Sequence, residues 1–134
     1  GLAQEGRATL NDALRLSAVD TTGFSCAPSV DADKLSVTFN GTGDVAAVEI
    51  LGSYLKQVHA EAQRLGVTEV TCDFRKLSFM NSSCFKAFVV WIDTVKNAAQ
   101  GYRIRFLTDP EMHWQRRSLE ALRRLATNVV TVEG

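Results

Sequence analysis

Two adjacent serines near the middle of the chain, Ser82 and Ser83, carry hydroxyl groups that can accept a phosphate. They follow Asn81 in the stretch FMNSSCFKAF, between an apolar run typical of a strand and one typical of a helix. At such a junction, Asn and Ser side chains accept hydrogen bonds from free N–H groups of the first helical turn. A helix N-terminus also tolerates a phosphate, because it carries partial positive charge. The residue types therefore indicate either helix capping or a phosphorylation site.

The residue after the serines, Cys84, is a candidate for thiol chemistry. A thiol in the first turn of a helix can have a lowered pKa, which would suit a redox sensor or a nucleophile. No His or carboxylate stands in a recognisable pattern to act as its base, so a small packing residue is the favoured interpretation. His59 and His113 lack metal-ligand spacing, and no C-x-x-C pair occurs. We therefore expect no metal site and no cofactor.

The elements that must position these residues follow from hydrophobic periodicity and turn signals. Val45 to Leu65 has a helical stripe, with Asp44 as N-cap and Gly66 just past the C-terminus. A second helix is predicted from Ser82 to about residue 100, closed by Gly101. A third is predicted from Pro110, near its first turn, to about Ala126, with Trp114, Leu122 and Leu125 facing the sheet. The predicted strands are Gly23–Pro28, Lys34–Phe39, Val67–Phe74, Tyr102–Leu107 and Asn128–Val132.

This order predicts an α/β domain with a mixed sheet of about five strands, an antiparallel N-terminal hairpin and three main helices packed on the sheet. The chain of 134 residues is long enough for one domain with a real core. We expect residues 1–13 to be a flexible tail and residues 14–134 to be the single domain.

Charge and hydropathy exclude some classes of partner. The formal net charge is zero, so attraction to nucleic acid or to an anionic membrane is not expected. No apolar run is long enough to span a bilayer, and the N-terminus lacks a signal-peptide pattern. We therefore expect a cytoplasmic protein. The arginines of the third helix are interpreted as a solvated face.

The helix after the serines is more apolar than one buried stripe requires. Ala87, Val90 and Trp91 extend its stripe and leave Lys86 among the few polar positions. The helix could be wedged deeply in the core, or it could present an exposed apolar patch beside the serines. In the second case, the helix start and the patch form one contact surface for a partner or a second copy.

The segment VTCDFRKLSFMNSSCFKAFVVWI, residues 70–92, resembles the core motif of the STAS family of bacterial anti-sigma factor antagonists. In that family an apolar strand ends in Asp, and a loop and an apolar pair then lead to Asp-Ser-Ser-Gly or Asp-Ser-Thr-Gly and an apolar helix. Asp73 matches the strand-end Asp, and Ser82 and Ser83 match the two hydroxyl residues. The element order extends the resemblance over roughly residues 23–132.

The resemblance implies a STAS-like fold and a regulatory protein rather than an enzyme. Family members bind an anti-sigma factor that is also a serine kinase, and phosphorylation of the first motif serine breaks that binding. A phosphatase, here a PP2C-type enzyme, restores it. Carried over, the phosphate acceptor is Ser82, with Ser83 as second choice. The implied partner surface comprises Asn81, Ser82, Ser83, Cys84, Lys86, Ala87, Val90 and Trp91.

Two positions depart from the family pattern. Asn81 stands where the motif has an acidic residue, and Cys84 stands where it has Gly. The first change removes a negative charge beside the acceptor, and the second adds a side chain near the partner surface. Two alternatives therefore stay open. One is a non-switching module for homodimerisation or scaffold assembly, and the other is an enzyme that uses Cys84 or Ser82.

Overall fold

The computed structural model describes residues 14–134, and the predicted flexible tail lies outside the described residues. This part of the chain begins with three strands, after which three helices alternate with three further strands. The strands are β1 (Val19–Thr21), β2 (Phe24–Asp31), β3 (Lys34–Gly43), β4 (Glu69–Met80), β5 (Arg103–Leu107) and β6 (Val130–Glu133). The helices are α2 (Val45–Leu65), α3 (Ser82–Lys96) and α4 (His113–Leu125).

The strands form one mixed sheet whose spatial order repeats the sequence order from β1 to β6. The first three strands pair antiparallel, and β3, β4, β5 and β6 pair parallel. Each parallel pair is joined through one helix, as a crossover connection requires. The α/β class, the N-terminal hairpin and the three helices are confirmed, with six strands in place of about five.

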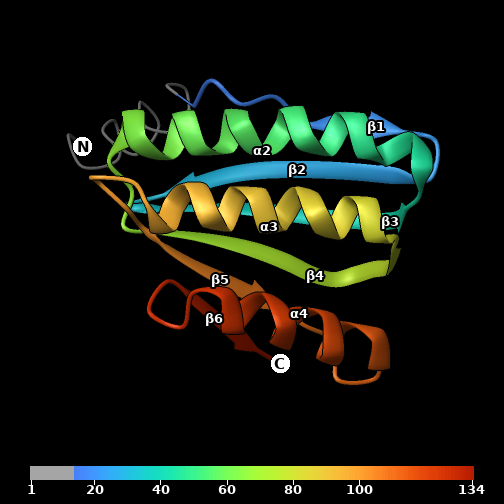
Figure 1. Cartoon of the computed structure of the whole chain (residues 1–134). Helices are drawn as coiled ribbons and strands as arrows, with labels where there is room; N and C mark the ends of the chain where they lie inside the picture. Colours follow the sequence, from blue (N-terminus) through green and yellow to red (C-terminus); the bar gives the residue numbers. More distant parts are fainter. Residues whose placement is uncertain (1–13) are drawn as a thin grey trace.

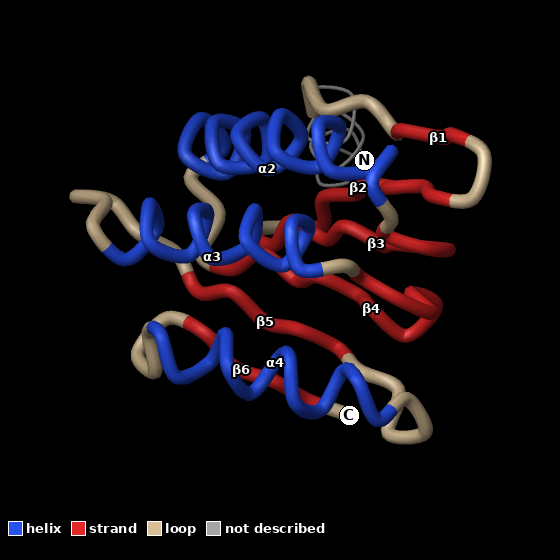
Figure 2. The backbone as a smooth tube through the Cα atoms, turned by 45° about the vertical axis from the view of Figure 1, so that its right-hand side comes forward, coloured by secondary structure: helices blue, strands red, loops and turns tan. Residues whose placement is uncertain are grey.

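All three helices cover the same face of the sheet, with α3 between α2 and α4 (Figure 1, Figure 2). In β3, the side chains of Leu35, Val37 and Phe39 are buried, and those between them are half-buried on the opposite face. The predicted stripe of α2 supplies buried residues such as Leu51 and Val58. The core therefore lies between the sheet and the helices. No helix in the described part of the chain is long and apolar enough to cross a membrane.

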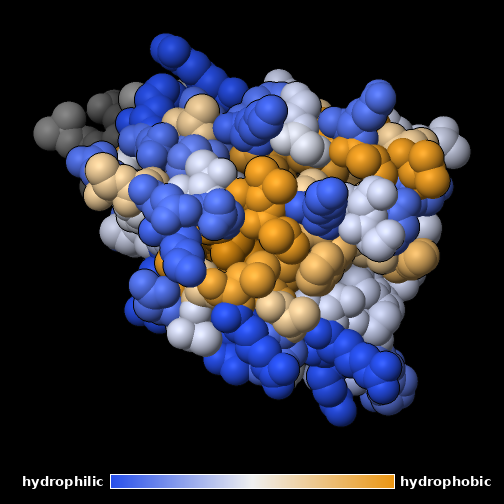
Figure 3. All heavy atoms as spheres, in the orientation of Figure 1, coloured by the Kyte–Doolittle hydropathy of each residue, from blue (hydrophilic) through white to orange (hydrophobic). Residues whose placement is uncertain are grey.

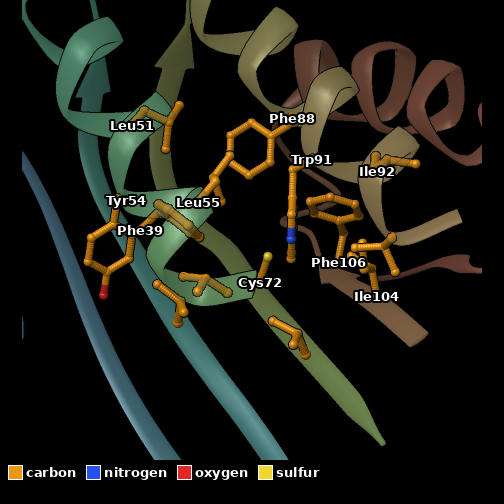
Figure 4. Close-up of a cluster of buried hydrophobic side chains, with 14 of the residues drawn as sticks. Phe39, Leu51, Tyr54, Leu55, Cys72, Phe88, Trp91, Ile92, Ile104 and Phe106 are labelled. Carbon is orange, nitrogen blue, oxygen red and sulfur yellow. The ribbon is translucent and has the colours of Figure 1, made fainter. Parts of the chain in front are cut away.

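Four phenylalanines from four different elements meet at the centre of the core. Phe88 of α3 packs edge-to-face against Phe39, Phe74 and Phe106, with ring centroids 5.7, 5.3 and 6.0 Å away. Figure 4 shows Phe88 and its neighbour Trp91 between α3 and the strands (Figure 4). Aromatic pairs favour this edge-to-face geometry. Phe88 therefore anchors α3 to three strands at once.

The strands β1, β3 and β4 differ most from the prediction. β1, which is only three residues long, was not predicted. β3 continues through Asn40 to Gly43, beyond the predicted end at Phe39. Gly41 permits this continuation, because its φ is +93° and an added Cβ would collide with the Gly23 carbonyl. β4 runs on from Phe74 to Met80, with register shifts against β3. The predicted loop before the serines is therefore the extended end of a strand.

One buried amide explains how β4 continues beyond its neighbour. Pairing between β4 and β5 ends at Asp73. The Gln115 side chain of α4 is fully buried, and its Nε2 donates to the carbonyl oxygens of Phe74 and Leu77, at 2.6 and 2.9 Å. Its Oε1 accepts from the Asp109 backbone N–H at 2.9 Å. Gln115 therefore satisfies backbone groups that have no strand partner on that side.

Two helix ends also differ from the prediction. α3 ends at Lys96, well before Gly101, and the Asn97 side chain donates to the Asp93 carbonyl. α4 begins at His113 rather than at Pro110. The reason is a turn in which the Asp109 carboxylate accepts from the Glu111 N–H and its carbonyl accepts from the Met112 N–H.

The sheet-facing residues of α4 need one correction. Leu122 is fully buried as predicted, and Trp114 is half-buried and packed against the core. Leu125, which was predicted to face the sheet, is 43% exposed. It is the last residue of the helix, where the chain turns away toward β6. Leu125 therefore belongs to the helix surface beside α3.

The buried hydroxyl of Tyr54 gives a first testable prediction. It has no hydrogen-bond partner among the described residues, and burial raises its pKa, so the hydroxyl stays neutral. Removing an unsatisfied buried polar group costs little or nothing, so Tyr54→Phe should leave the free energy of unfolding unchanged or raise it by up to about 1 kcal/mol. Urea unfolding measures this. The control is Tyr102→Phe, which removes hydrogen bonds to Trp91 and His59 and should cost about 1–2 kcal/mol. An equal loss in both variants would contradict the prediction.

Candidate functional site

The serine pair lies where β4 ends and α3 begins. Asn81 is the residue between the two elements, and its Oδ1 accepts from the Cys84 N–H at 2.8 Å. Its own N–H donates to the Gly43 carbonyl oxygen at 2.8 Å, which fixes the junction against the end of β3. The predicted capping role of Asn81 is confirmed. Because an amide oxygen caps as well as a carboxylate, the helix start does not need the acidic residue of the family motif.

Ser82 and Ser83 are the first two residues of α3, and both are exposed. Neither hydroxyl has a hydrogen-bond partner within residues 14–134, because Asn81 already caps the helix. A serine that caps a helix would have its oxygen engaged with a backbone N–H. These two oxygens are instead available to a reagent or partner from outside. The interpretation of the serines as capping residues is therefore wrong, because their hydroxyl groups are exposed and Asn81 caps the helix.

Cys84 points into the protein and is fully buried. Its thiol donates to the Asp44 carbonyl oxygen, with a sulfur–oxygen distance of 3.6 Å, and so joins the starts of α2 and α3. Burial raises the pKa of the Cys84 thiol, with a further contribution from Asp44. The position at a helix N-terminus does not make this thiol reactive. The side chain that replaces the motif glycine therefore adds no bulk to the outer surface.

The charges around Ser82 suit an anion. Ser82 is at the N-terminus of a 15-residue helix, where backbone N–H groups and the helix dipole favour negative charge. Lys86 is exposed four residues further on, which places it on the same side of the helix. A phosphate on Ser82 would therefore fit the helix start without unfolding it. Its charge of about −2 would change the properties of every surface next to it.

Two exposed apolar side chains stand near this end of α3, and the sequence did not single them out. Val45, the first residue of α2, is 81% exposed, and Phe79, near the end of β4, is 46% exposed. The Asp44–Cys84 contact and the Asn81–Gly43 hydrogen bond bring their two segments together. Large apolar side chains exposed near a candidate site are typical of interaction surfaces. Phe79 lies two residues after buried Leu77, so the alternation of a strand predicts that Phe79 is buried too. Its exposure could therefore not be predicted from the sequence pattern.

The outward face of α3 continues the apolar surface away from the serines. Val90 is 56% exposed, and Ala87 and Val89 are half-buried. Figure 3 shows hydrophobic residues gathered over α3 and bordered by hydrophilic ones (Figure 3). Trp91 lies beneath this face, with only 3% of its surface exposed. Of the predicted contact residues, Trp91 and Cys84 are therefore interior residues that support the surface.

The charged residues of α4 have the arrangement of a solvated helix surface. On α4, Arg123 and Arg124 both lie within ion-pair distance of Glu120, as a solvated helix face does. In residues 14–134, no group of three or more His, Cys, Asp or Glu residues could hold a metal ion. Ser82 has no hydrogen bond to a base in this part of the chain, whereas an activated serine nucleophile needs one.

Comparisons with known proteins bear on the fold. No family model and no curated protein matches the sequence. Among solved structures, an anti-sigma factor antagonist from Mycobacterium paratuberculosis matches with 13% identity over 83% of this chain and 87% of that chain, at a TM-score of 0.62. The unphosphorylated anti-sigma factor antagonist SpoIIAA matches with 23% identity over 70% of this chain and 81% of that chain, at a TM-score of 0.51. The phosphorylated form of SpoIIAA, from Bacillus, also matches.

A further match comes from a complex of a different kind. It is a chain in the structure of the Pseudomonas aeruginosa diguanylate cyclase SiaD in complex with its activator SiaC. Identity is 15% over 87% of this chain and 98% of that chain, at a TM-score of 0.58. These likenesses show the fold. The chain has the STAS-like fold that its serine motif implied.

Proposed function

We propose that this chain is a regulatory protein-binding module of the STAS type, which binds a partner through the start of α3 and is switched by phosphorylation of Ser82. The observation that carries the proposal is the state of the two serines. Ser82 and Ser83 are exposed and have no hydrogen bond within the described residues, because Asn81 alone caps the helix. A hydroxyl that the fold does not use can be modified without a structural penalty.

The binding surface combines this helix start with its apolar surroundings. We assign to it the serines and Asn81, the α3 residues Lys86, Ala87 and Val90, and the flanking residues Val45 and Phe79. Cys84 and Trp91 contribute from beneath. An interface with apolar residues around Ser82 would exclude water from that serine. A phosphate placed there would need its charge desolvated, which opposes binding.

The proposed partner is an anti-sigma factor with serine-kinase activity, and a PP2C-type phosphatase would reverse the modification. Two of the matched structures support this choice, because SpoIIAA is an anti-sigma factor antagonist that has been solved in unphosphorylated and phosphorylated forms. A cytoplasmic location follows from the proposal, because the kinase needs ATP. The chain itself is proposed to be a binding protein and not an enzyme.

Phosphopeptide mapping tests the acceptor assignment. The protein is incubated with ATP and a serine kinase encoded near its gene, and the modified peptides are identified by mass spectrometry. We expect phosphate on Ser82 in the wild type and in Ser83→Ala, and none in Ser82→Ala. A PP2C-type phosphatase should remove it. Modification of Ser82→Ala to the wild-type extent would reject Ser82 as the acceptor.

A second candidate function is a non-switching module for homodimerisation or scaffold assembly. The exposed apolar face of α3 around Val90 favours it, because such a face can pack against a second copy. An assembly that forms through this face and is indifferent to substitution of Ser82 would support this alternative. An enzyme based on Cys84 is disfavoured, because its thiol is buried and has a raised pKa.

A further inference from the structure

A groove lies between α2 and α3, away from the serine end. It has a volume of about 250 Å³ and is lined largely by apolar groups. Gly52, Lys56 and His59 border it from α2, and Ala87, Val90 and Trp91 border it from α3. Half-enclosed apolar cavities with a few polar groups are the usual form of small-molecule sites. This one could hold a small ligand about the size of a substituted benzene ring.

Gly52 makes the groove, and the fold does not otherwise need a glycine there. It lies in the interior of the 21-residue helix α2, where glycine is less favourable than alanine. A Cβ atom added at Gly52 would meet no atom of another element within 4 Å, so no neighbouring element requires its absence. Its backbone conformation is ordinary helix. The missing side chain therefore leaves open space at the surface, and a ligand-binding site needs such space.

A chain of hydrogen bonds fixes a donor at the same groove. Trp91 Nε1 donates to the Tyr102 hydroxyl oxygen at 2.9 Å, and that oxygen lies 2.7 Å from His59 Nδ1. Tyr102 and Trp91 are buried, so the tyrosine proton needs an acceptor, and His59 Nδ1 provides one. His59 is then the tautomer that carries its proton on Nε2. Burial also lowers the pKa of His59, which keeps the ring neutral.

Two of the polar side chains at the groove, His59 and Lys56, can donate to a ligand, whereas the Thr94 hydroxyl already donates to the Val90 carbonyl oxygen at 2.9 Å. His59 Nε2–H has no hydrogen-bond partner among residues 14–134, and Lys56 brings a positive charge to the same side of the groove. No acidic side chain lines the groove. An apolar cavity beside an ammonium group and an N–H donor is complementary to an apolar molecule that ends in a carboxylate.

We propose that the α2–α3 groove is a binding site for a small apolar carboxylic acid, whose ring or short chain lies on Gly52 and Ala87 and whose carboxylate contacts Lys56 and His59. This site does not depend on phosphorylation of Ser82, and it can exist whether or not the proposed switch does. It shares Ala87 and Val90 with the proposed partner surface, so the two occupants would be neighbours.

The test uses 3-phenylpropanoate as the probe and 3-phenylpropan-1-ol as its uncharged control. Binding of each to the whole chain is monitored by the change in backbone ¹⁵N chemical shifts. We expect the acid to shift groove residues such as Gly52, Ala87 and Thr94, and to bind at least about fivefold more tightly than the alcohol. Lys56→Met should abolish this preference, whereas Lys76→Met, on β4, should retain it.

Filling the groove provides the second arm. Gly52→Leu should weaken binding at least about tenfold, because the leucine takes the space of the ligand ring. The variant should fold, since leucine favours helices and its Cβ meets no neighbour. Ser53→Leu, the same side chain on the next, exposed residue, should bind as the wild type does. Equal binding by acid and alcohol, or unchanged binding by Gly52→Leu, would overturn the proposal. So would a concentration-dependent dimer that Gly52→Leu abolishes while neither probe binds, because the occupant would then be a second copy.

Discussion

Ser82→Asp is expected to weaken binding of the partner about 100-fold, whereas Ser82→Asn should stay within about threefold of the wild type. The two replacements have nearly the same size and differ in charge. A carboxylate near Phe79 and Val45 would lose its water in the complex, and the helix start and Lys86 already stabilise it in the free protein, so they do not offset this loss. A 100-fold loss corresponds to about 2.7 kcal/mol, within the range for an unpaired charge at an interface. Isothermal titration calorimetry with the purified partner measures the effect.

The free protein should tolerate the aspartate well. At the first position of α3 a negative charge interacts favourably with the helix dipole, so Ser82→Asp should melt no lower than the wild type. Loss of binding in a stable variant would then report on the interface. Should Ser82→Asp bind within threefold of Ser82→Asn, the switch would be rejected and the non-switching module favoured. Ser83→Asp, one position further along, separates an effect of position from one of net charge.

Phe88→Ala is expected to lower the free energy of unfolding by about 3–5 kcal/mol, the largest effect of any single change considered for the fold. Phe88 is 1% exposed and contacts aromatic rings from three strands as well as Trp91. The truncation removes these contacts and leaves a cavity under α3. A domain of this size is stable by only about 5–15 kcal/mol, so the variant keeps a fraction of its stability. Urea unfolding followed by circular dichroism gives the difference.

Phe85 of the same helix supplies the matched control. It is only half-buried, so Phe85→Ala removes the same atoms from a site that water already reaches. We expect it to cost less than half as much as Phe88→Ala. Equal losses for the two variants would show that the aromatic centre of the core is not what holds α3 on the sheet.

Much of the fold is encoded locally and could be predicted. The α2 stripe, its Asp44 cap and its Gly66 end follow from spacing and residue type, and all three are present. Asp44 accepts from the Ala46 N–H, and Gly66 has a positive φ of 68°. In β3 the apolar residues Leu35, Val37 and Phe39 alternate with polar ones in the sequence, and these three are the buried residues. Each of these signals lies within one element, so no long-range contact was needed to interpret it.

Features that depend on distant partners could not be predicted. β4 runs past the charged residues Arg75 and Lys76 because β3 pairs with it on one side and Gln115 satisfies its carbonyls on the other. β1 is too short to show a period and exists through its pairing with β2. The start of α4 is set by a turn around Asp109. In each case a tertiary contact overrides the local signal.

In the candidate site, too, the features set by local sequence could be predicted and those set by distant contacts could not. Residue types at the junction predicted that Asn81 caps α3, and the hydrogen bond to Cys84 N–H confirms it. They could not predict which neighbours face inward. Cys84 and Trp91 are interior residues because of where the first turn of α3 lies against α2 and the sheet. Phe79 is exposed on the part of β4 that extends beyond β5.

The inward position of Cys84 has a practical consequence for spectroscopy. The three cysteines of the chain are all buried, and burial raises the pKa of Cys26, Cys72 and Cys84 alike. Maleimide reagents attack the exposed thiolate, so the native thiols should stay unlabelled in the folded protein. A single cysteine introduced at Ser83 would then carry a fluorophore selectively at the start of α3. Its emission could follow each encounter with a partner in real time, without a cysteine-free background.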